Sequence, residues 1–387
     1  MNSRALEKMD APRRVLLVCP QRIGDVLLAT PLARSIKQAW PGVQLDMLVF
    51  AGTEGVLEGN DDISEFIVIP GRAPMIERFR QLQNLWRRYD LAVSPLPTDR
   101  ARIYCWAAGK KRFGVVQPLA KDRAKKWLLH QALNFDDLDT HTVSMGLRLT
   151  KLLGIRPCHE VVPPGVLPDK LTPLLARLGE LGDAPFAVLH TFPKFRYKMW
   201  TETGWVALVQ ALHARGLGVI LTGSADPAEM AYVEKIARAS PVGALNLAGT
   251  LSLAETAELI RRAVLYVGPD TAVTHMAAAT GTPTVALFGP SNPVKWGPWP
   301  STWTGEASPW LRVGSGRQGN VYLLQGSAPC VPCMLEGCER HINSRSDCLD
   351  TLAVGSVLMA IDSQRLNTKT PKIIMLKSSE TPTVDHG

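Results

Sequence analysis

Residues 14–50 read RVLLVCPQRIGDVLLATPLARSIKQAWPGVQLDMLVF, which contains two apolar runs separated by a glycine turn and a helical pattern. The run Arg14–Cys19 is rich in Val and Leu, as expected of a strand buried on both faces. Gly24 lies in the turn that follows, a helical pattern covers residues 25–38, and Gln44–Phe50 reads as the next strand. A strand–helix–strand unit of this kind predicts a parallel sheet.

The alternation continues on both sides of a Pro- and Gly-rich segment. Further strands are predicted at residues 65–70, 90–94, 186–190, 218–223, 264–268 and 284–289, with a helix over residues 74–88. We therefore expect an α/β protein with two Rossmann-like domains. The predicted division is an N-terminal domain (13–160), a linker (161–184), a C-terminal domain (185–349), a helix (350–366) and a disordered tail (367–387).

The composition and net charge of the chain indicate which classes of protein it can belong to. The chain has 387 residues, 46% hydrophobic and 20% charged, with a net charge of +8, which favours anionic partners. No apolar run reaches the length of a membrane-spanning helix, and the N-terminus lacks a signal peptide's apolar middle. We expect a cytoplasmic protein whose seven cysteines are reduced.

Asp25 is the first candidate for chemistry. It follows Gly24 after the first strand, where the N-terminus of a helix offers free N–H groups beside the ligand-binding edge of an α/β sheet. A general base is one interpretation, and a helix N-cap is the other. A GxGxxG fingerprint is missing after this strand, which argues against a dinucleotide-dependent dehydrogenase.

Two segments of the second half could hold phosphate. Lys194, Arg196 and Lys198 crowd the loop after the strand at 186–190, and they could neutralise a diphosphate or form a solvated basic loop. Asp270 and Thr271 follow the strand at 264–268 and open a helix of small residues, whose N-terminus is a potential anion site. His275 reads as a hydrogen-bonded structural histidine, with a catalytic role as the alternative.

Several motifs occur together and in order: RIGDVLLATPLARSIKQAWPG, the Lys198-Met199-Trp200 region, LTGSADPAE, LNLAGTLSLAE and VGPDTAVTHMAAATGTPTVALFGPSNP. On these motifs the chain resembles glycosyltransferase family 9, the ADP-heptose:lipopolysaccharide heptosyltransferases. The resemblance extends over roughly residues 13–365.

The resemblance implies a GT-B fold, in which two Rossmann-like domains face a central cleft and a C-terminal helix crosses back to the first domain. It implies inverting transfer of heptose from ADP-L-glycero-D-manno-heptose, with no metal required for catalysis. The implied acceptor is the lipid A-linked core of lipopolysaccharide. The enzyme would then be cytoplasmic and peripheral, at the anionic inner face of the inner membrane, with no nucleic-acid partner.

The resemblance also implies roles for individual residues. Asp25 matches the family's general base, Lys198 the lysine at the leaving diphosphate, and Asp270 the aspartate at the donor diphosphate and sugar. The implied donor-binding residues are Gly24, Thr191, Lys194, Gly223, Ser224, Leu251, Ser252, Thr271, Ala272 and His275.

The chain departs from the family pattern at two places. Pro269 and Ala272 flank the Asp-Thr pair, where the family commonly has Asn and Gly, and Thr191-Phe192 replaces a Pro-Gly pair. Both places lie at the diphosphate and sugar end of the donor site. They bear on the identity of the donor sugar more than on the fold.

Cys330, Cys333, Cys338 and Cys348 form a C-x2-C-x4-C-x9-C cluster. Four soft ligands in a short segment suit a structural Zn²⁺ or Fe ion. Reduced thiols without a metal and a disulfide are the alternatives.

Nine Lys and Arg residues lie between residues 100 and 126, with Trp106 and Trp127 among them. One interpretation is a face for a phosphorylated acceptor and an anionic membrane surface, and the other is an ordinary solvated surface. The residues assigned to this acceptor and membrane face are Arg22, Arg100, Arg102, Lys110, Lys111, Arg112, Lys121 and Arg123.

A lipopolysaccharide heptosyltransferase is the leading functional hypothesis. The alternatives are the same fold with another nucleotide sugar or a protein acceptor, and a nucleotide-sugar-binding protein without turnover.

Overall fold

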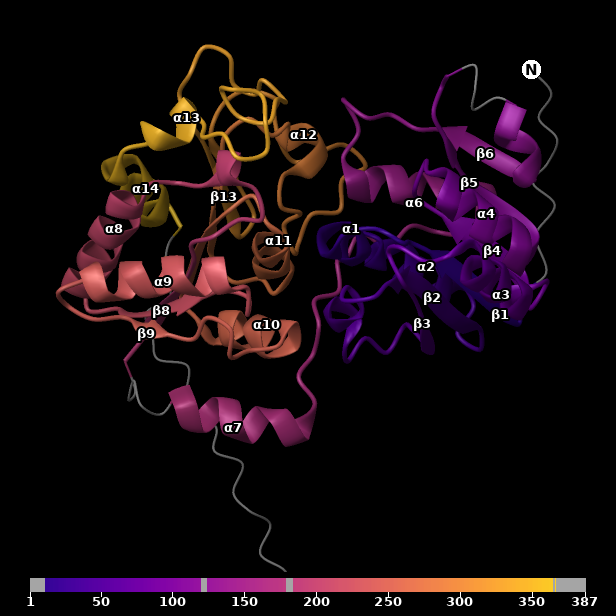
Figure 1. The fold of residues 1–387 in the computed structure, drawn as a ribbon, viewed down its shortest axis with the longest axis horizontal. Helices are drawn as coiled ribbons and strands as arrows, with labels where there is room; N and C mark the ends of the chain where they lie inside the picture. The colour runs from indigo at the N-terminus through magenta and orange to yellow at the C-terminus, as the bar shows by residue number, and fades with distance from the viewer. Residues whose placement is uncertain (1–10, 120–123, 179–183, 365, 367–387) are drawn as a thin grey trace, which may run out of the picture.

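The computed structural model describes residues 11–119, 124–178, 184–364 and 366, which form two α/β domains side by side (Figure 1). Each domain is built on its own sheet, and the N-terminal and C-terminal halves of the chain supply one sheet each. The predicted α/β class with two parallel sheets is confirmed. The tail from residue 367 lies outside the described residues.

The N-terminal sheet has the strand order β3-β2-β1-β4-β5-β6, with every neighbouring pair parallel. Strand order reverses beside β1, so the carboxyl end of β1 lies at a switch point, where open α/β sheets bind ligands. The strands are β1 (Arg14–Val18), β2 (Gln44–Phe50), β3 (Glu65–Ile69), β4 (Tyr89–Ser94), β5 (Gly109–Val116) and β6 (Gln131–Asn134).

The helix predicted over residues 25–38 is two helices, α1 (Ile23–Leu28) and α2 (Thr30–Ala39). Pro31 has no N–H to continue the helical ladder, and Thr30 Oγ1 donates to Leu27 O at 2.7 Å. The other helices of this half are η1 (Glu54–Leu57), α3 (Met75–Leu85), α4 (Asp99–Ala108), η2 (Ala124–Leu128) and α6 (Thr142–Leu153).

The C-terminal sheet has the order β12-β13-β11-β10-β7-β8-β9 and is parallel except for the pair β12–β13. The sequence predicted no strand in the Trp-, Pro- and Gly-rich segment 290–320, but β12 lies within it and β13 directly follows it. The strands are β7 (Phe186–His190), β8 (Gly218–Thr222), β9 (Leu245–Asn246), β10 (Leu265–Pro269), β11 (Thr284–Phe288), β12 (Gly316–Gln318) and β13 (Val321–Gln325).

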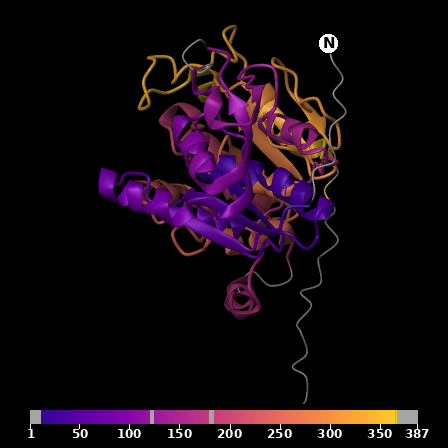
Figure 2. The same cartoon turned by 90° about the vertical axis from the view of Figure 1, so that its right-hand side faces the viewer.

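The predicted linker contains a helix, α7 (Pro168–Leu178), which is seen nearly end-on in Figure 2. It contacts α10, and Lys170 Nζ lies 2.8 Å from Glu58 Oε1 of the N-terminal domain. The other helices of the second half are η4 (Arg196–Lys198), α8 (Glu202–Ala214), α9 (Pro227–Ala239), α10 (Leu253–Arg262), α11 (Ala272–Ala279), α12 (Pro293–Trp296), α13 (Asp347–Asp350) and α14 (Val354–Asp362).

The expected C-terminal crossing helix corresponds to α14, which packs on α8, β11 and β13 of the C-terminal domain (Figure 1). Val357, Ala360 and Ile361 are buried in that domain's core, which holds the helix there. The crossing back to the first domain is therefore not made by α14, and residues 365 and 367–387 are not described.

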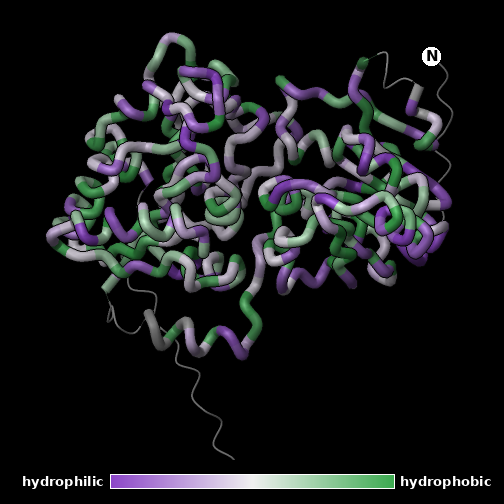
Figure 3. Tube along the Cα trace, in the orientation of Figure 1, coloured by the Kyte–Doolittle hydropathy of each residue, from purple (hydrophilic) through white to green (hydrophobic). Residues whose placement is uncertain are grey.

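Hydrophobic residues line both sheets, so each domain has a core of its own (Figure 3). The two domains are also joined directly. Trp299 belongs to the core of the N-terminal domain, and its Nε1 donates to His159 O at 2.9 Å. His141 Nε2 lies 2.8 Å from Gly297 O, and Asn292 Nδ2 donates to Leu138 O at 2.8 Å.

We call these contacts between residues 138–159 and 292–312 the interdomain strap. Its members also include the ion pair between Arg312 and Asp139.

Within the described residues, no helix is both long and apolar enough to span a bilayer.

Candidate active site

The two sheets bring their ligand-binding edges together where α1 contacts α11. A Cβ atom on Gly24 would lie 3.8 Å from Cδ2 of His275, so the turn before Asp25 faces the helix that follows Asp270. A side chain of one carbon at this position would make only ordinary van der Waals contact, so the two domains lie close together here without requiring glycine. The structure thus places the turn of the predicted base beside His275 and Ala272, two of the predicted donor residues.

Asp25 is the third residue of α1, and the N-cap is Arg22. The simple N-cap interpretation of Asp25 is therefore wrong, although the backbone N–H of Arg22 does interact with its carboxylate. Burial raises the pKa of Asp25 to about 6, against the opposing effects of the Arg22 and Lys295 charges and of backbone hydrogen bonds. Asp25 as a whole residue is of intermediate solvent exposure. A partly accessible carboxylate with a pKa near neutrality is suited to accepting a proton.

Asp270 is buried and forms an ion pair with Lys198, whose Nζ lies 2.5 Å from Oδ2. Burial raises the pKa of Asp270, but the charges of Lys198 and His275 and hydrogen bonds from Lys198 and Ser291 bring it below its ordinary value. Asp270 is therefore a permanent anion that fixes the Lys198 ammonium at the carboxyl edge of the sheet.

Two buried polar atoms beside this pair lack a hydrogen-bond partner among the described residues: Nδ1 of His275 and Oγ1 of Thr191. The interpretation of His275 as a fully hydrogen-bonded structural histidine is not supported at Nδ1. Burial lowers the pKa of His275 to about 4, so the ring is neutral at pH 7. Unpaired buried polar groups are costly, and these two would gain a partner if a polar ligand entered.

Other predicted donor residues act as helix caps. Thr271 is the N-cap of α11, which begins at Ala272, and its hydroxyl accepts the Thr274 N–H. Ser252 is the N-cap of α10 and forms a capping box with Glu255, while Leu251 packs on a core cluster. The capping roles account for these hydroxyls without a ligand.

Gly223 and Ser224 contact a residue that the sequence analysis did not single out, Glu229 of α9. Ser224 Oγ donates to Glu229 Oε2 at 2.5 Å, and a Cβ on Gly223 would lie 3.0 Å from Glu229 Oε1. Glu229 is buried and its charge raises the pKa of His190, against a larger lowering by burial. The spacing of Asp226 and Glu229, an N-cap followed by an acid three residues later, was the available signal.

Phe195 lies between cations of both domains. The Arg22 guanidinium lies 5.2 Å from the centre of its ring, and Lys194 Nζ lies 5.9 Å from it. Arg22 was expected on the acceptor and membrane face, but it reaches the loop of the second domain. Lys194 is exposed.

Lys295 of α12 is a second residue that sequence reasoning missed. It is buried, forms an ion pair with Asp137 of the other domain, and lies over the rings of Phe135 (5.1 Å) and Trp296 (4.8 Å). Burial lowers its pKa to about 8, while the charge of Asp25 raises it. Lys295 therefore contributes a positive charge near Asp25.

The cysteine cluster lies behind the loop that carries Lys198. All seven cysteines are free thiols, so the disulfide alternative is wrong. Burial and the neighbouring Cys333, Cys338 and Cys330 raise the pKa of Cys348 to about 12. Among the described residues, however, no three His, Cys, Asp or Glu side chains are arranged to bind a metal. The residues as arranged do not fit a metal ion.

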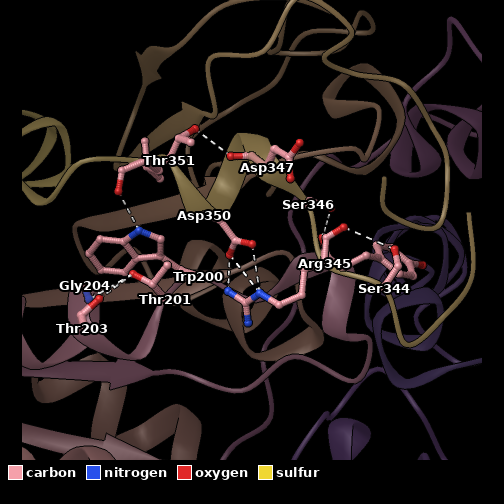
Figure 4. A network of polar contacts seen from close by, with 12 residues as sticks. Trp200, Thr201, Thr203, Gly204, Ser344, Arg345, Ser346, Asp347, Asp350 and Thr351 are labelled. Atoms are coloured by element: carbon pink, nitrogen blue, oxygen red, sulfur yellow. Dashed lines mark hydrogen bonds and ion pairs between the residues drawn. The ribbon is translucent and has the colours of Figure 1, made fainter. Parts of the chain in front are cut away.

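Hydrogen bonds join the segment after Cys338 to the start of α8 (Figure 4). Ser346 Oγ donates to Tyr197 O at 2.7 Å, directly before Lys198, and Trp200 Nε1 donates to Leu352 O at 2.8 Å. Within the same segment, Arg345 forms an ion pair with Asp350. The segment thereby supports the position of Lys198.

The acceptor and membrane face is only partly an open surface. Arg102 is buried and paired with Asp99, so its assignment to this face is wrong. Lys110 and Lys111 are exposed, and Lys110 is paired with Asp90 at 3.0 Å.

Two other members of this face make local contacts. Arg100 Nη1 donates to Gly71 O at 2.8 Å, and Arg112 Nε donates to His130 Nδ1 at 3.2 Å. Lys121 and Arg123 lie outside the described residues.

Comparisons with known proteins agree with the geometry. Residues 163–307 match the model of "Glycosyltransferase family 9 (heptosyltransferase)". The chain is 28% identical over 288 residues to lipopolysaccharide heptosyltransferase 3 of Escherichia coli K12, covering 71% of this chain and 82% of the relative.

Two solved structures share the fold. A glycosyl transferase family 9 protein from Veillonella parvula superposes with a TM-score of 0.73 at 16% identity, covering 92% of this chain and 98% of that one. The E. coli ADP-heptose lps heptosyltransferase II superposes with a TM-score of 0.70 at 19% identity, covering 91% and 98%.

Proposed function

We propose that this chain, whose residues 163–307 match the glycosyltransferase family 9 model, transfers a heptose from ADP-L-glycero-D-manno-heptose to the inner core of lipopolysaccharide. The observation that carries the proposal is that two acidic residues with different environments, Asp25 and Asp270, belong to the two segments that meet where α1 contacts α11. Asp25, a carboxylate of raised pKa, lies on α1, and α1 contacts α11, the helix that follows the Lys198–Asp270 pair.

In the proposed reaction Asp25 is the general base. The acceptor hydroxyl oxygen attacks the anomeric carbon of the donor sugar, and its proton passes to the Asp25 carboxylate. With a pKa of about 6, Asp25 is mostly ionised at pH 7 and still basic enough to accept the proton. The proposed attack comes from the side opposite the leaving diphosphate, and such an attack inverts the configuration at the anomeric carbon.

The same step breaks the bond between the anomeric carbon and the diphosphate oxygen, which leaves with the electron pair. The Lys198 ammonium and the N-terminus of α11 supply positive charge at the predicted diphosphate position. These groups support a mechanism that needs no metal at the reacting centre. The unpaired Thr191 hydroxyl and His275 Nδ1 are candidates to bind the donor sugar or diphosphate.

The proposed acceptor is anchored in lipid through lipid A, so the enzyme would work at the cytoplasmic face of the inner membrane. The net charge of +8 and the exposed Lys110 and Lys111 support an anionic partner.

Thermal unfolding with ADP, UDP, GDP, CDP and ADP-heptose, each at saturation, tests the donor assignment. A ligand at about 100 times its Kd adds about 2.7 kcal/mol to the free energy of unfolding, which raises Tm by several degrees. We expect ADP to raise Tm and ADP-heptose to raise it further. No response to ADP together with a response to UDP or GDP would contradict the ADP-heptose donor.

A different nucleotide sugar is the second candidate, favoured by Pro269 and Ala272 on either side of the Asp-Thr pair. Pro269 is the last residue of β10 and has no N–H to offer a phosphate. The same unfolding series decides between the two donors.

A further inference from the structure

Helix α3 carries apolar side chains that the described residues leave exposed. Met75, Ile76 and Phe79 are 78%, 62% and 58% exposed. The opposite side of the helix packs on α4, where Tyr104 Oη donates to Gln81 Oε1 at 2.6 Å. A helix that is packed on one side and apolar on another has a second surface to bury.

Exposed tryptophans lie just beyond the end of α3 and next to α4. Trp86 and Trp127 are 50% and 68% exposed, and Trp106 of α4 lies between them with ring-centre distances of 5.1 and 6.5 Å. The Arg87 guanidinium lies 5.5 Å from the Trp86 ring centre. Tryptophan side chains with one wet and one apolar side are characteristic of membrane–water interfaces. We call Met75, Ile76, Phe79, Trp86 and Trp127 the α3 face.

The charges around the α3 face are mostly positive. Residues 71–88 contain five arginines and one acid, Glu77. Arg72, Arg80, Arg87 and Arg88 are exposed. Apolar and tryptophan side chains flanked by arginines complement an anionic lipid surface, where acidic headgroups meet the cations and the acyl boundary meets the apolar groups.

The position of α3 connects this face to the candidate active site. α3 follows the carboxyl end of β3, which lies at the same sheet edge as the end of β1 and Asp25. Arg100 holds the connecting loop, since its Nη1 donates to Gly71 O and its guanidinium lies 5.0 Å from the Phe50 ring centre. A bilayer against α3 would therefore lie beside the edge where the acceptor has to enter.

We propose that the α3 face docks on a bilayer that contains anionic phospholipid, with Met75, Ile76 and Phe79 entering the headgroup region. The inference rests on the proposed function in so far as a lipid-anchored acceptor gives the docking its purpose. In Figure 1, α3 lies in the N-terminal domain on the side away from the C-terminal domain, so a bilayer there would leave that domain uncovered.

The test is flotation of the full chain with vesicles of equal parts phosphatidylglycerol and phosphatidylcholine. The triple variant Met75→Ser, Ile76→Ser, Phe79→Ser should bind at least about tenfold more weakly than the natural sequence. The double variant Arg80→Glu, Arg88→Glu should lose at least about tenfold on these vesicles.

A control variant removes equally exposed apolar side chains elsewhere: Leu311→Ser, Val313→Ser, Met359→Ser, which are 80%, 64% and 68% exposed in the C-terminal domain. It should bind vesicles like the natural sequence. Equal binding by the α3 triple variant, or equal loss in the control, would overturn the proposal. A triple variant that changes only self-association in size-exclusion chromatography would overturn it too, by identifying a second copy as the partner.

Transfer to a soluble, delipidated core oligosaccharide separates this inference from the proposed function. The α3 triple variant should keep the natural rate with that acceptor while losing vesicle binding. If the natural sequence transfers nothing to it but flotation behaves as expected, the docking inference stands and the heptosyltransferase proposal fails.

Discussion

Asp25 in the N-terminal domain and Asp270 in the C-terminal domain each follow a strand inside a parallel sheet and stand at the start of a helix. Their acidities differ in direction. The pKa of Asp25 is raised to about 6, chiefly by burial, whereas at Asp270 the Lys198 and His275 charges and two hydrogen bonds outweigh burial and lower the pKa. The two aspartates occupy the same topological position, so the opposite directions of their pKa shifts come from the residues around them.

The cations explain why. Lys198 bonds directly to Asp270, whereas Lys295, the cation near Asp25, is held by Asp137 and by two aromatic rings. One aspartate is therefore a fixed anion that anchors an ammonium, and the other can exchange a proton near neutral pH. Paired sites whose environments separate their pKa values divide the chemical roles between them.

The largest effect is expected for Asp25→Asn, which keeps the shape of the side chain but cannot accept the proton. The transfer rate should fall about 10²–10⁴-fold, with donor binding retained. Measured kcat for the natural sequence should fall as pH drops through about 6, because Asp25 becomes protonated. Asp169→Asn, in the first turn of the remote α7, is the matched control and should leave kcat unchanged. Normal turnover by the Asp25→Asn enzyme would contradict the assignment of Asp25 as the general base, and with it the different roles of Asp25 and Asp270.

A smaller effect, on stability, is expected for Asp270→Asn, because it leaves the Lys198 ammonium without its partner. The free energy of unfolding should fall by about 1–3 kcal/mol at pH 7, less than for a fully buried pair because the Lys198 side chain is 21% exposed. Since the folded pKa of Asp270 lies below the ordinary value, its contribution is present above the unfolded pKa of about 3.9 and is lost as pH falls below it.

Chemical denaturation of Asp270→Asn, Lys198→Met and the double variant measures this coupling. The double variant should recover part of the loss, because no unpaired charge remains. Strictly additive losses would show that Asp270 does not depend on Lys198.

The smallest effect is expected for Lys295→Met. Removing this cation takes away an influence that lowers the pKa of Asp25, so the acid limb of the kcat–pH profile should move upward from about 6, by up to about one unit. Arg312→Met is the control, since it also removes an interdomain ion pair, with Asp139, but is not among the charges that influence Asp25. A limb that does not move with Lys295→Met, or moves equally with Arg312→Met, would contradict the role of Lys295.

Sequence patterns predicted most of the central strands, because runs such as Arg14–Val18 and Thr284–Phe288 are apolar throughout. They missed β5, whose first half carries Lys110, Lys111 and Arg112, and β13, which follows a long irregular segment. Local pattern also could not place the break before Pro31 between α1 and α2.

The candidate site divides in the same way. Asp25, Asp270 and Lys198 belong to recognisable motifs that follow strands, so they can be found from the sequence, although their roles stay predictions. Lys295 acts through a contact between distant segments, and nothing local marks it. The burial of Arg102 could not be predicted from the sequence either, because it depends on how α4 packs.

The interdomain strap has a mechanical consequence. Its hydrogen bonds and Trp299 fasten residues 138–159 to residues 292–312, while α1 and α11 meet at a separate place. A movement that keeps the strap intact cannot translate one domain away from the other. It has to be a hinge rotation of one domain relative to the other, about the strap. The strap is then the pivot, and a small rotation there would change the separation of Asp25 and Lys198 without breaking a single bond in either sheet.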